Sequence, residues 1–392
     1  MRCVRVSPPQ RRRSPSLRML RRQPLSVPYP DQVPFLARLI ELKGPVHPAN
    51  PARLVEAAIY HAVAGYVQRA LAAGCLTLPT ADAQRVAEFH RQAVLQTAVL
   101  RRELGVIVAP LETACQAPVL LLKGPALAEL FYPDWRLRPS ADLDLMVPKA
   151  RLEGACCSLE SLGYERLVEF RPGYAERHGH DVHLRRRLGR RWWADVELHW
   201  RVGDDPASAV LSHERLQIDS DTLEVDNTRL AIPAASVQLI IIAVHLLSDR
   251  AKRLAWINDL VLVTRSLTED QWDETFGLAE TWGLLWPLHR ALDYGQRHLG
   301  CNRPRPRPDG APPAWGPLRA VEDLNIRAAP HLGRLAALGW RERGGFLKAV
   351  LFPTRQGLRG TVGAENGGAS TWQLVRRHTR KALAGLAPPP RR

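Results

Sequence analysis

Apolar residues recur at spacings of three and four along residues 35–104, which is the spacing that gives a helix one apolar face. Residues that show this spacing are Leu54, Ala57, Ala58, Tyr60, Ala62, Val86, Phe89, Ala93 and Leu95. Because the segment has few runs of β-branched residues, we expect a helical bundle. The helical pattern returns after Pro233 and again from Leu318.

The pattern changes at Ala117, where short apolar runs typical of buried strands begin. Strands and helices interleave over roughly 90 residues here, which predicts a small mixed-sheet unit of the α/β (α+β) class. Strands are expected over residues 119–122, 142–147, 164–168, 181–185 and 195–202. Helices are expected over residues 125–130 and 149–162. The most apolar stretch, 230–247, is interpreted as a buried helix rather than a transmembrane span.

These patterns divide the chain into six segments. We expect a disordered basic tail, an N-terminal helical region, an α/β core, a second helical region, a proline-rich linker, and a C-terminal helical extension with a basic tail. Their expected bounds are, respectively, residues 1–34, 35–105, 106–205, 206–300, 301–317 and 318–392.

The net charge of +16 first suggests a nucleic-acid partner. Its location changes that interpretation. Residues 1–22 contain eight Arg and no acid, and residues 373–392 contain five Arg, one Lys and no acid. The body between the two ends is therefore close to neutral. The six scattered Cys favour reduced thiols in a cytoplasmic protein. The N-terminus lacks the apolar run of a secretory signal, and either Met1 or Met19 can be the true start.

Asp142 and Asp144 are two residues apart on one of the expected strands. Side chains alternate along a strand, so both carboxylates project to the same side. Two adjacent carboxylates are costly to keep ionised together, and a divalent cation between them removes that cost. A strand end with two solvated acids would show the same motif.

A second acid-bearing strand is expected over residues 195–202, where the alternation is strict. One side carries Val196, Leu198, Trp200 and Val202, and the other carries Asp195, Glu197, His199 and Arg201. An acid on a neighbouring strand can complete a three-carboxylate site for two metal ions. An ordinary amphipathic strand with one wet face has the same pattern.

Lys123 and Gly124 follow the apolar run 119–122 and precede Pro125. The pattern predicts a strand that enters a helix through a glycine turn. Such a turn presents backbone N–H groups to an anion, and Lys123 can supply a positive charge to phosphate. A plain turn that needs glycine for its backbone conformation is the alternative.

In this order, the three segments resemble the uncharacterised nucleotidyltransferases of the DNA polymerase β-like superfamily. The matching residues are Lys123-Gly124, Tyr132-Pro133, Arg138, Asp142-Leu-Asp144-Leu-Met-Val147, Gly163-Tyr164 and Glu197-Leu-His199-Trp200. Weaker resemblance continues at His245, Trp256-Ile-Asn-Asp259 and Phe352-Pro353. One departure is Pro125, because the superfamily places Ser or Gly after the glycine. Proline has no N–H, so one potential phosphate donor is missing.

The resemblance implies a polymerase-β-like core flanked by helices and a metal-dependent transfer of a nucleoside monophosphate from an NTP to an acceptor. It implies that Asp142, Asp144 and Glu197 are the catalytic carboxylates and hold Mg²⁺ or Mn²⁺. It also implies that Arg138 contacts phosphate or fixes the aspartate strand. The residues that it places at the nucleotide are Lys123, Gly124, Arg138 and His199.

Several points stay open at the level of sequence. The acceptor can be a small molecule, a protein or a tRNA. No membrane partner is expected, and the sequence does not give the oligomeric state. The alternative function is a catalytically weak or inactive nucleotide- or RNA-binding protein on the same fold, which Pro125 and the Arg-rich tails fit. Asp259 can cap a helix, pair with an Arg such as Arg253, or line the cleft. Residues 178–191 hold three His beside an Arg run, interpreted as a solvated hairpin rather than a zinc site.

Overall fold

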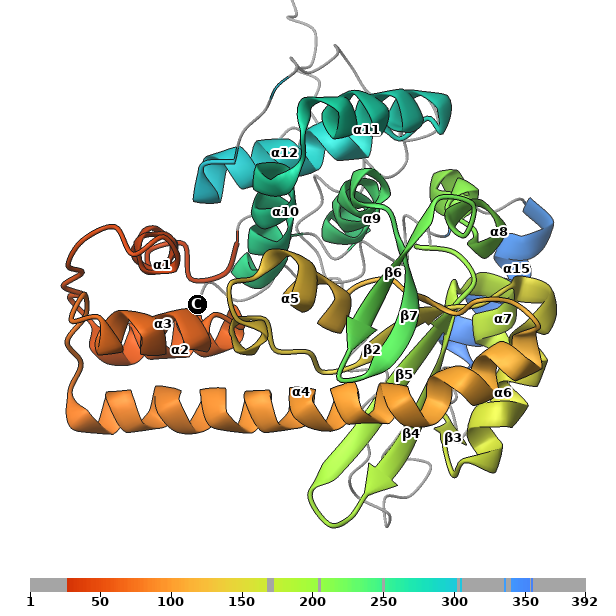
Figure 1. The fold of residues 1–392 in the computed structure, drawn as a ribbon, viewed down its shortest axis with the longest axis horizontal. Coiled ribbons are helices and arrows are strands. Elements are labelled where there is room, and N and C mark those ends of the chain that lie inside the picture. Colours follow the sequence, from red (N-terminus) through yellow and green to blue (C-terminus); the bar gives the residue numbers. More distant parts are fainter. Residues whose placement is uncertain are drawn as a thin grey trace, which may run out of the picture.

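A mixed seven-stranded sheet with helices on both sides forms the centre of the protein (Figure 1). The computed structural model describes residues 27–167, 173–203, 206–248, 251–301, 304, 335, 340–352 and 354. This architecture confirms the α/β class expected from the interleaved helix and strand patterns.

Four helices form the N-terminal part of the described chain, as the periodicity of residues 35–104 predicts. Asn50 caps the second of them, because its side chain accepts a hydrogen bond from the Arg53 N–H at 3.0 Å. The last one continues past the expected end of the region at residue 105, since Ile107 and Leu111 stay fully buried. The four helices are α1 (Val33–Ile40), α2 (Pro51–Tyr60), α3 (Ala64–Ala72) and α4 (Thr80–Cys115).

The disordered tail was expected to span residues 1–34, but the structure shows an ordered segment from residue 27. The Tyr29 side chain is buried, and its ring centroid lies 5.6 Å from that of Tyr60. The Pro28 carbonyl accepts a hydrogen bond from His61 Nε2 at 2.8 Å. These contacts hold residues 27–32 against α2, so the expectation of disorder is wrong for them. Residues 1–26 lie outside the described part of the chain.

The sheet has the strand order β3-β4-β5-β2-β1-β7-β6. At its centre, β2 pairs in parallel with β5 and antiparallel with β1, and β1 pairs in parallel with β7. The first five strands in the chain overlap the strand predictions, although β5 begins at Trp192 and ends at His199 instead of spanning 195–202. The strands are β1 (Leu120–Leu121), β2 (Leu143–Met146), β3 (Glu165–Arg166), β4 (Asp181–Leu188), β5 (Trp192–His199), β6 (Ser220–Val225) and β7 (Thr228–Pro233).

The hairpin of β6 and β7 is a correction to the sequence analysis. It lies in residues 206–300, which were expected to be helical, and it takes the beginning of the apolar stretch 230–247. Asp226 and Asn227 have φ angles of 46° and 66°, as the central residues of a tight hairpin turn require. Alternating side chains such as Leu230 then become buried on one side of the sheet. The helix begins only after the strand, at Ala235.

The two sides of the sheet pack against different helices. Leu143 and Leu145 belong to the core cluster shared with α4 and α6, whereas Met146 belongs to the cluster shared with the N-terminal helices and with α9, α10 and α12. Asp144 alternates with these leucines and therefore faces the second side. The other α-helices in the described residues are α5 (Pro125–Phe131), α6 (Leu152–Ser161), α7 (Tyr174–His178), α8 (His213–Leu216), α9 (Ala235–Ser248), α10 (Leu254–Ser266), α11 (Glu269–Thr281), α12 (Leu285–Leu299) and α15 (Trp340–Leu351).

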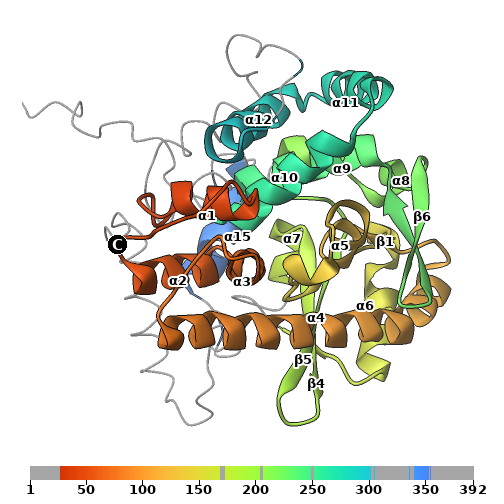
Figure 2. The ribbon, with the colours of Figure 1, turned by 60° about the vertical axis from the view of Figure 1, so that its left-hand side comes forward.

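Figures 1 and 2 both place α4 on the opposite side of the molecule from α9 to α12. No helix in the described residues is long and apolar enough to cross a membrane. Most of the predicted proline-rich linker, 301–317, lies outside the described residues, as does most of the C-terminal extension beyond α15.

Candidate active site

Asp144 and Glu197 are register partners on two adjacent parallel strands, β2 and β5. Asp144 is buried, and Glu197 is partly buried. Asp142 lies immediately before β2. Burial, together with the negative charges of Asp144 and Glu197, raises the pKa of Asp142 to about 7. The fold therefore brings together the three carboxylates that the sequence motif singles out.

Lys123 extends from the turn after β1 into this carboxylate cluster. Its Nζ lies 2.9 Å from Asp144 Oδ1. Burial lowers the pKa of Lys123, but the charges of Asp144, Glu197 and Asp142 outweigh burial and raise it above the ordinary value. In return, the pKa of Asp144 lies well below its usual range. Burial raises this pKa, but the Lys123 charge and the His199 hydrogen bond lower it by more. Lys123 is thus a charged partner of the buried aspartate.

His199 is the second cationic partner of the cluster. Its Nε2 lies 3.2 Å from Asp144 Oδ1 and 3.4 Å from Glu197 Oε2. Burial lowers the pKa of His199, but these two hydrogen bonds, with the charge of Asp181, raise it to about 10. His199 therefore joins the two register partners by hydrogen bonding to both.

His245 contacts Lys123 from the other side of the site. Lys123 Nζ lies 3.3 Å from His245 Nδ1. Burial and the Lys123 charge keep the pKa of His245 well below its ordinary value, so the neutral ring accepts this hydrogen bond. The ring also packs against Trp256, with centroids 5.4 Å apart. Helix α9 thereby helps to hold the lysine in place.

Gly124 has a backbone conformation that favours glycine, with φ 65° and ψ −116°. A Cβ at this position would lie 3.1 Å from Ser140 Oγ. The turn therefore packs closely against the loop that leads to Asp142. Helix α5 begins directly after it with Pro125, which contributes no N–H. The approach of this turn to a phosphate stays a prediction.

Arg138 forms a bidentate ion pair with Asp259 of α10. Its Nε and one terminal nitrogen lie 3.1 and 2.8 Å from the two carboxylate oxygens. The other terminal nitrogen lies 3.4 Å from Ser140 Oγ, two residues before Asp142. Of the roles left open for Asp259, the structure selects pairing, with Arg138 rather than with Arg253.

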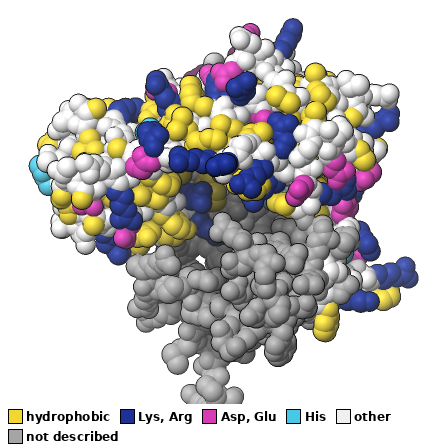
Figure 3. Space-filling view, turned by 90° about the horizontal axis from the view of Figure 1, so that it is seen from below, with side chains coloured by type: hydrophobic (Ala, Val, Ile, Leu, Met, Phe, Trp, Pro, Cys, Tyr) yellow, Lys and Arg dark blue, Asp and Glu magenta, His cyan; other side chains and the backbone are white. Residues whose placement is uncertain are grey.

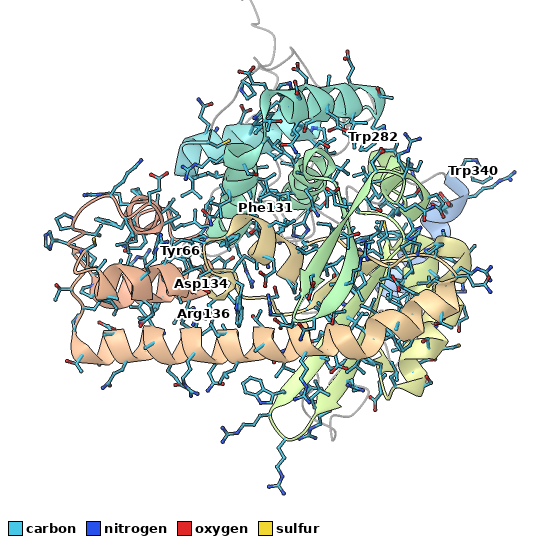
Figure 4. All side chains as sticks on the ribbon, viewed as in Figure 1. Tyr66, Phe131, Asp134, Arg136, Trp282 and Trp340 are labelled. Carbon is cyan, nitrogen blue, oxygen red and sulfur yellow. The ribbon has the colours of Figure 1, made fainter. Side chains whose placement is uncertain are left out.

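The ion pair belongs to a buried hydrogen-bond network. The Tyr132 hydroxyl donates to Asp259 Oδ1 at 2.6 Å. The Asn258 amide nitrogen lies 3.2 Å from the Tyr132 hydroxyl and 3.0 Å from the Tyr66 hydroxyl. Figure 4 labels Tyr66 on α3 and, near it, Asp134 and Arg136 of the segment that follows α5. The network therefore joins the N-terminal helices and α10 to the loop that precedes β2.

Comparison with known families supports the relationship that the motif suggested. Residues 47–300 match the family model described as an uncharacterised nucleotidyltransferase. The chain belongs to this nucleotidyltransferase family. The matched range contains the entire seven-stranded sheet and helices α9 to α12. A search of curated proteins finds no match to the chain.

The side chains of the carboxylate cluster fit a divalent cation. Ligand atoms of Asp144, Glu197 and His199 lie within 4.8 Å of one another. Asp142 belongs to no such group within the described residues. Burial and, after it, repulsion from the other two carboxylates raise its pKa. A divalent cation would remove this repulsion, and carboxylate oxygens are the ligands that Mg²⁺ and Mn²⁺ prefer.

Asp195, the other acid of β5, is excluded from the cluster by its own partner. Both of its oxygens accept hydrogen bonds from Arg185, its register partner on β4. The register of β2 and β5 places Glu197 beside Asp144, and Arg185 pairs with Asp195.

The one histidine of β4 is a correction to the expected solvated hairpin. His183 is not simply solvated, because its Nε2 lies 2.7 Å from Asp181 Oδ2 and its Nδ1 lies 3.5 Å from Glu197 Oε1. Sequence analysis did not single out Asp181. The sequence does contain a signal for it. Asp181 and His183 are two residues apart on a strand, so their side chains lie on the same side, as those of Asp142 and Asp144 do.

Proposed function

We propose that the protein is a metal-dependent nucleotidyltransferase that transfers a nucleoside monophosphate from an NTP to an acceptor. The acceptor oxygen forms a bond to the α-phosphorus, the bond from that phosphorus to the bridging oxygen of the β-phosphate breaks, and pyrophosphate leaves. The observation that carries the proposal is the pairing of Asp144 with Glu197 across β2 and β5, with Asp142 beside them.

Each side chain has a role in this proposal. Asp142, Asp144 and Glu197 would hold Mg²⁺ or Mn²⁺, which when bound supplies positive charge to the phosphates. Glu197 has a side-chain exposure of 20%, against 3% for Asp144, and would accept the proton of the acceptor hydroxyl. Lys123 carries a buried positive charge beside Asp144 and would neutralise phosphate oxygens.

The roles of the remaining predicted residues follow from their contacts. His199 would orient Glu197 and Asp144, because it hydrogen-bonds to both. Gly124 would keep the turn after β1 close to the loop before Asp142. Arg138 would act on that loop and not directly on phosphate, since Asp259 accepts two of its hydrogen bonds.

The acceptor is best identified by following the label. Purified protein is incubated with cell extract, Mg²⁺ or Mn²⁺, and each NTP labelled in turn at the α- or γ-phosphate. The proposal expects α-label to become attached to an acceptor and γ-label to appear as pyrophosphate. A molecule that acquires γ-label instead would indicate phosphoryl transfer and would contradict the proposal.

A second candidate is an NTP-binding protein that turns over slowly or not at all. Two observations favour it: Pro125 occupies the first position of α5, and Lys123 already binds Asp144. Saturable NTP binding in equilibrium dialysis, with no pyrophosphate released in the presence of extract, would support this candidate.

The surface bears on the choice between acceptors. Figure 3 shows the α4 side of the molecule, where Lys and Arg side chains lie among hydrophobic and acidic ones. A tRNA acceptor favours a continuous basic surface that neutralises many phosphates. Label incorporation into RNA, protein and small molecules is therefore scored separately, and RNA incorporation should fall steeply with salt if tRNA is the acceptor.

A further inference from the structure

The polar side of the sheet continues beyond Glu197 onto β4. Asp144, Glu197 and His183 are register partners in a row across β2, β5 and β4. His199 and Asp181 are partners in the next row across β5 and β4. Because residues two apart on a strand share a side, these side chains form one continuous array.

Glu197 lies at the centre of this array with one oxygen toward each half. Its Oε2 lies 3.4 Å from His199 Nε2, on the side of Asp144. Its Oε1 lies 3.5 Å from His183 Nδ1, on the side of β4. Asp181 Oδ2 lies 2.7 Å from His183 Nε2. A carboxylate placed in this way can bridge two neighbouring sites.

We propose that Asp181, His183 and Glu197 form a second divalent-cation site, adjacent to the Asp142–Asp144 site and sharing Glu197 with it. One ligand atom from each of the three residues lies within 4.8 Å of the others. Metal–ligand bonds of about 2.0–2.2 Å place the ligands of a tetrahedral ion about 3.4 Å apart. One ion binds only one nitrogen of the His183 ring, and the 4.8 Å limit on the ligand atoms of this group includes that spacing.

The ligand atoms indicate which ion the site takes. An imidazole nitrogen with two carboxylates suits Zn²⁺ and other transition-metal ions, whereas Mg²⁺ favours oxygen ligands alone. The two neighbouring sites would therefore differ in preference, with Mg²⁺ or Mn²⁺ at Asp142 and Asp144 and Zn²⁺ at Asp181 and His183.

Other imidazole groups lie next to Asp181. A ligand atom of His199 lies within 4.8 Å of those of His180 and Asp181, and the rings of His180 and His199 are 5.4 Å apart. Asp181 thus has additional imidazole groups around it.

The site is accessible to an ion from solvent. The side-chain exposures of Asp181, His183 and Glu197 are 13%, 38% and 20%. These values leave room for water to complete the coordination and for ions to enter, which a preformed site requires.

The test measures Zn²⁺ binding directly, so it does not depend on turnover. The full-length protein is dialysed against Zn²⁺, bound metal is counted by mass spectrometry, and Co²⁺ is used as a spectroscopic substitute for Zn²⁺. We expect His183→Ala and Asp181→Asn each to weaken Zn²⁺ binding by more than the roughly 10- to 100-fold that loss of an outer-shell partner costs. The Co²⁺ absorption bands should change with them.

Two further variants make the result decisive. His47→Ala removes an exposed histidine away from the array and should leave Zn²⁺ binding unchanged. Asp142→Asn alters the proposed catalytic carboxylates and should also retain Zn²⁺, so failure of this proposal is distinguishable from failure of nucleotidyl transfer. Wild-type Zn²⁺ affinity in both His183→Ala and Asp181→Asn would overturn the inference. The inference would also be overturned if Asp142→Asn lost Zn²⁺ while His183→Ala and Asp181→Asn kept it.

Discussion

Arg138 and Asp259 are 121 residues apart in the sequence and form a bidentate ion pair, with N–O distances of 3.1 and 2.8 Å. Their side chains are 11% and 4% exposed, so the pair is largely removed from water. It joins α10 to the loop that ends at Asp142. The geometry of the carboxylate cluster therefore depends on a helix that contributes no side chain to it.

Asp259→Ala should be strongly destabilising, because it leaves the Arg138 guanidinium buried without its partner. Loss of one member of a buried pair costs about 3–5 kcal/mol of unfolding free energy. Urea unfolding at neutral pH measures the difference. The matched control is Glu88→Ala, which breaks the exposed Arg91–Glu88 pair and should cost no more than about 1 kcal/mol. Equal, small losses in the two variants would show that the buried pair is not important for stability.

Gly124→Ala should also destabilise the fold, by about 1–3 kcal/mol, because the backbone conformation at this position is unfavourable for other residues. The added Cβ would also press on Ser140 Oγ. Gly277→Ala is the control, since a Cβ at that position of α11 meets open space. It should be neutral or raise stability by up to about 1 kcal/mol. Thermal unfolding distinguishes the two, and a stabilised Gly124→Ala would contradict our description of the turn.

His61 should make stability depend on pH. Burial lowers its pKa to about 4, and the Pro28 carbonyl and the Leu254 N–H satisfy its two ring nitrogens in the neutral form. An unfolded chain protonates this residue below about pH 6.5. The stabilisation is therefore complete above pH 6.5 and is lost as the pH falls toward 4, by up to about 3 kcal/mol.

The measurement is the difference in unfolding free energy between the wild type and His61→Gln at several pH values. Other titrating groups cancel in this difference, which should shrink as the pH falls from 6.5. His47→Gln, which removes a histidine at an exposed position, is the control variant. A wild-type advantage that stays constant from pH 7.5 to pH 5 would contradict the account.

Local alternation of residue types was sufficient to predict much of the site. The spacing of Asp142 and Asp144 places both on one side of a strand, and the strict alternation of β5 does the same for Glu197 and His199. The choice of Glu197 over Asp195 came from the family motif, because alternation alone puts both acids on the same side. Pairing of β2 with β5 aligns Asp144 with Glu197, and Arg185 on β4 neutralises Asp195.

Other features depend on contacts that no local pattern encodes. His245 contacts Lys123 and Asp259 contacts Arg138 only because α9 and α10 pack beside the sheet. The β6–β7 hairpin, in contrast, carried a local signal. Alternating apolar residues flank the Asp226-Asn227 turn, but the long apolar run that follows gave the region a helical appearance.

Pyrophosphate release by the Asp142→Asn/Asp144→Asn variant tests the central claim most directly. The assay uses the NTP, the metal ion and the acceptor fraction that give label transfer with the wild type. Asp195→Asn is the matched control, because this acid lies on β5 but pairs with Arg185 instead of the cluster. Thermal unfolding of each variant confirms that the fold is retained, and Asp142→Asn alone serves if the double variant unfolds. We predict a loss of at least about 100-fold in the double variant and near wild-type release in the control. Full turnover in the folded double variant would contradict the proposed mechanism.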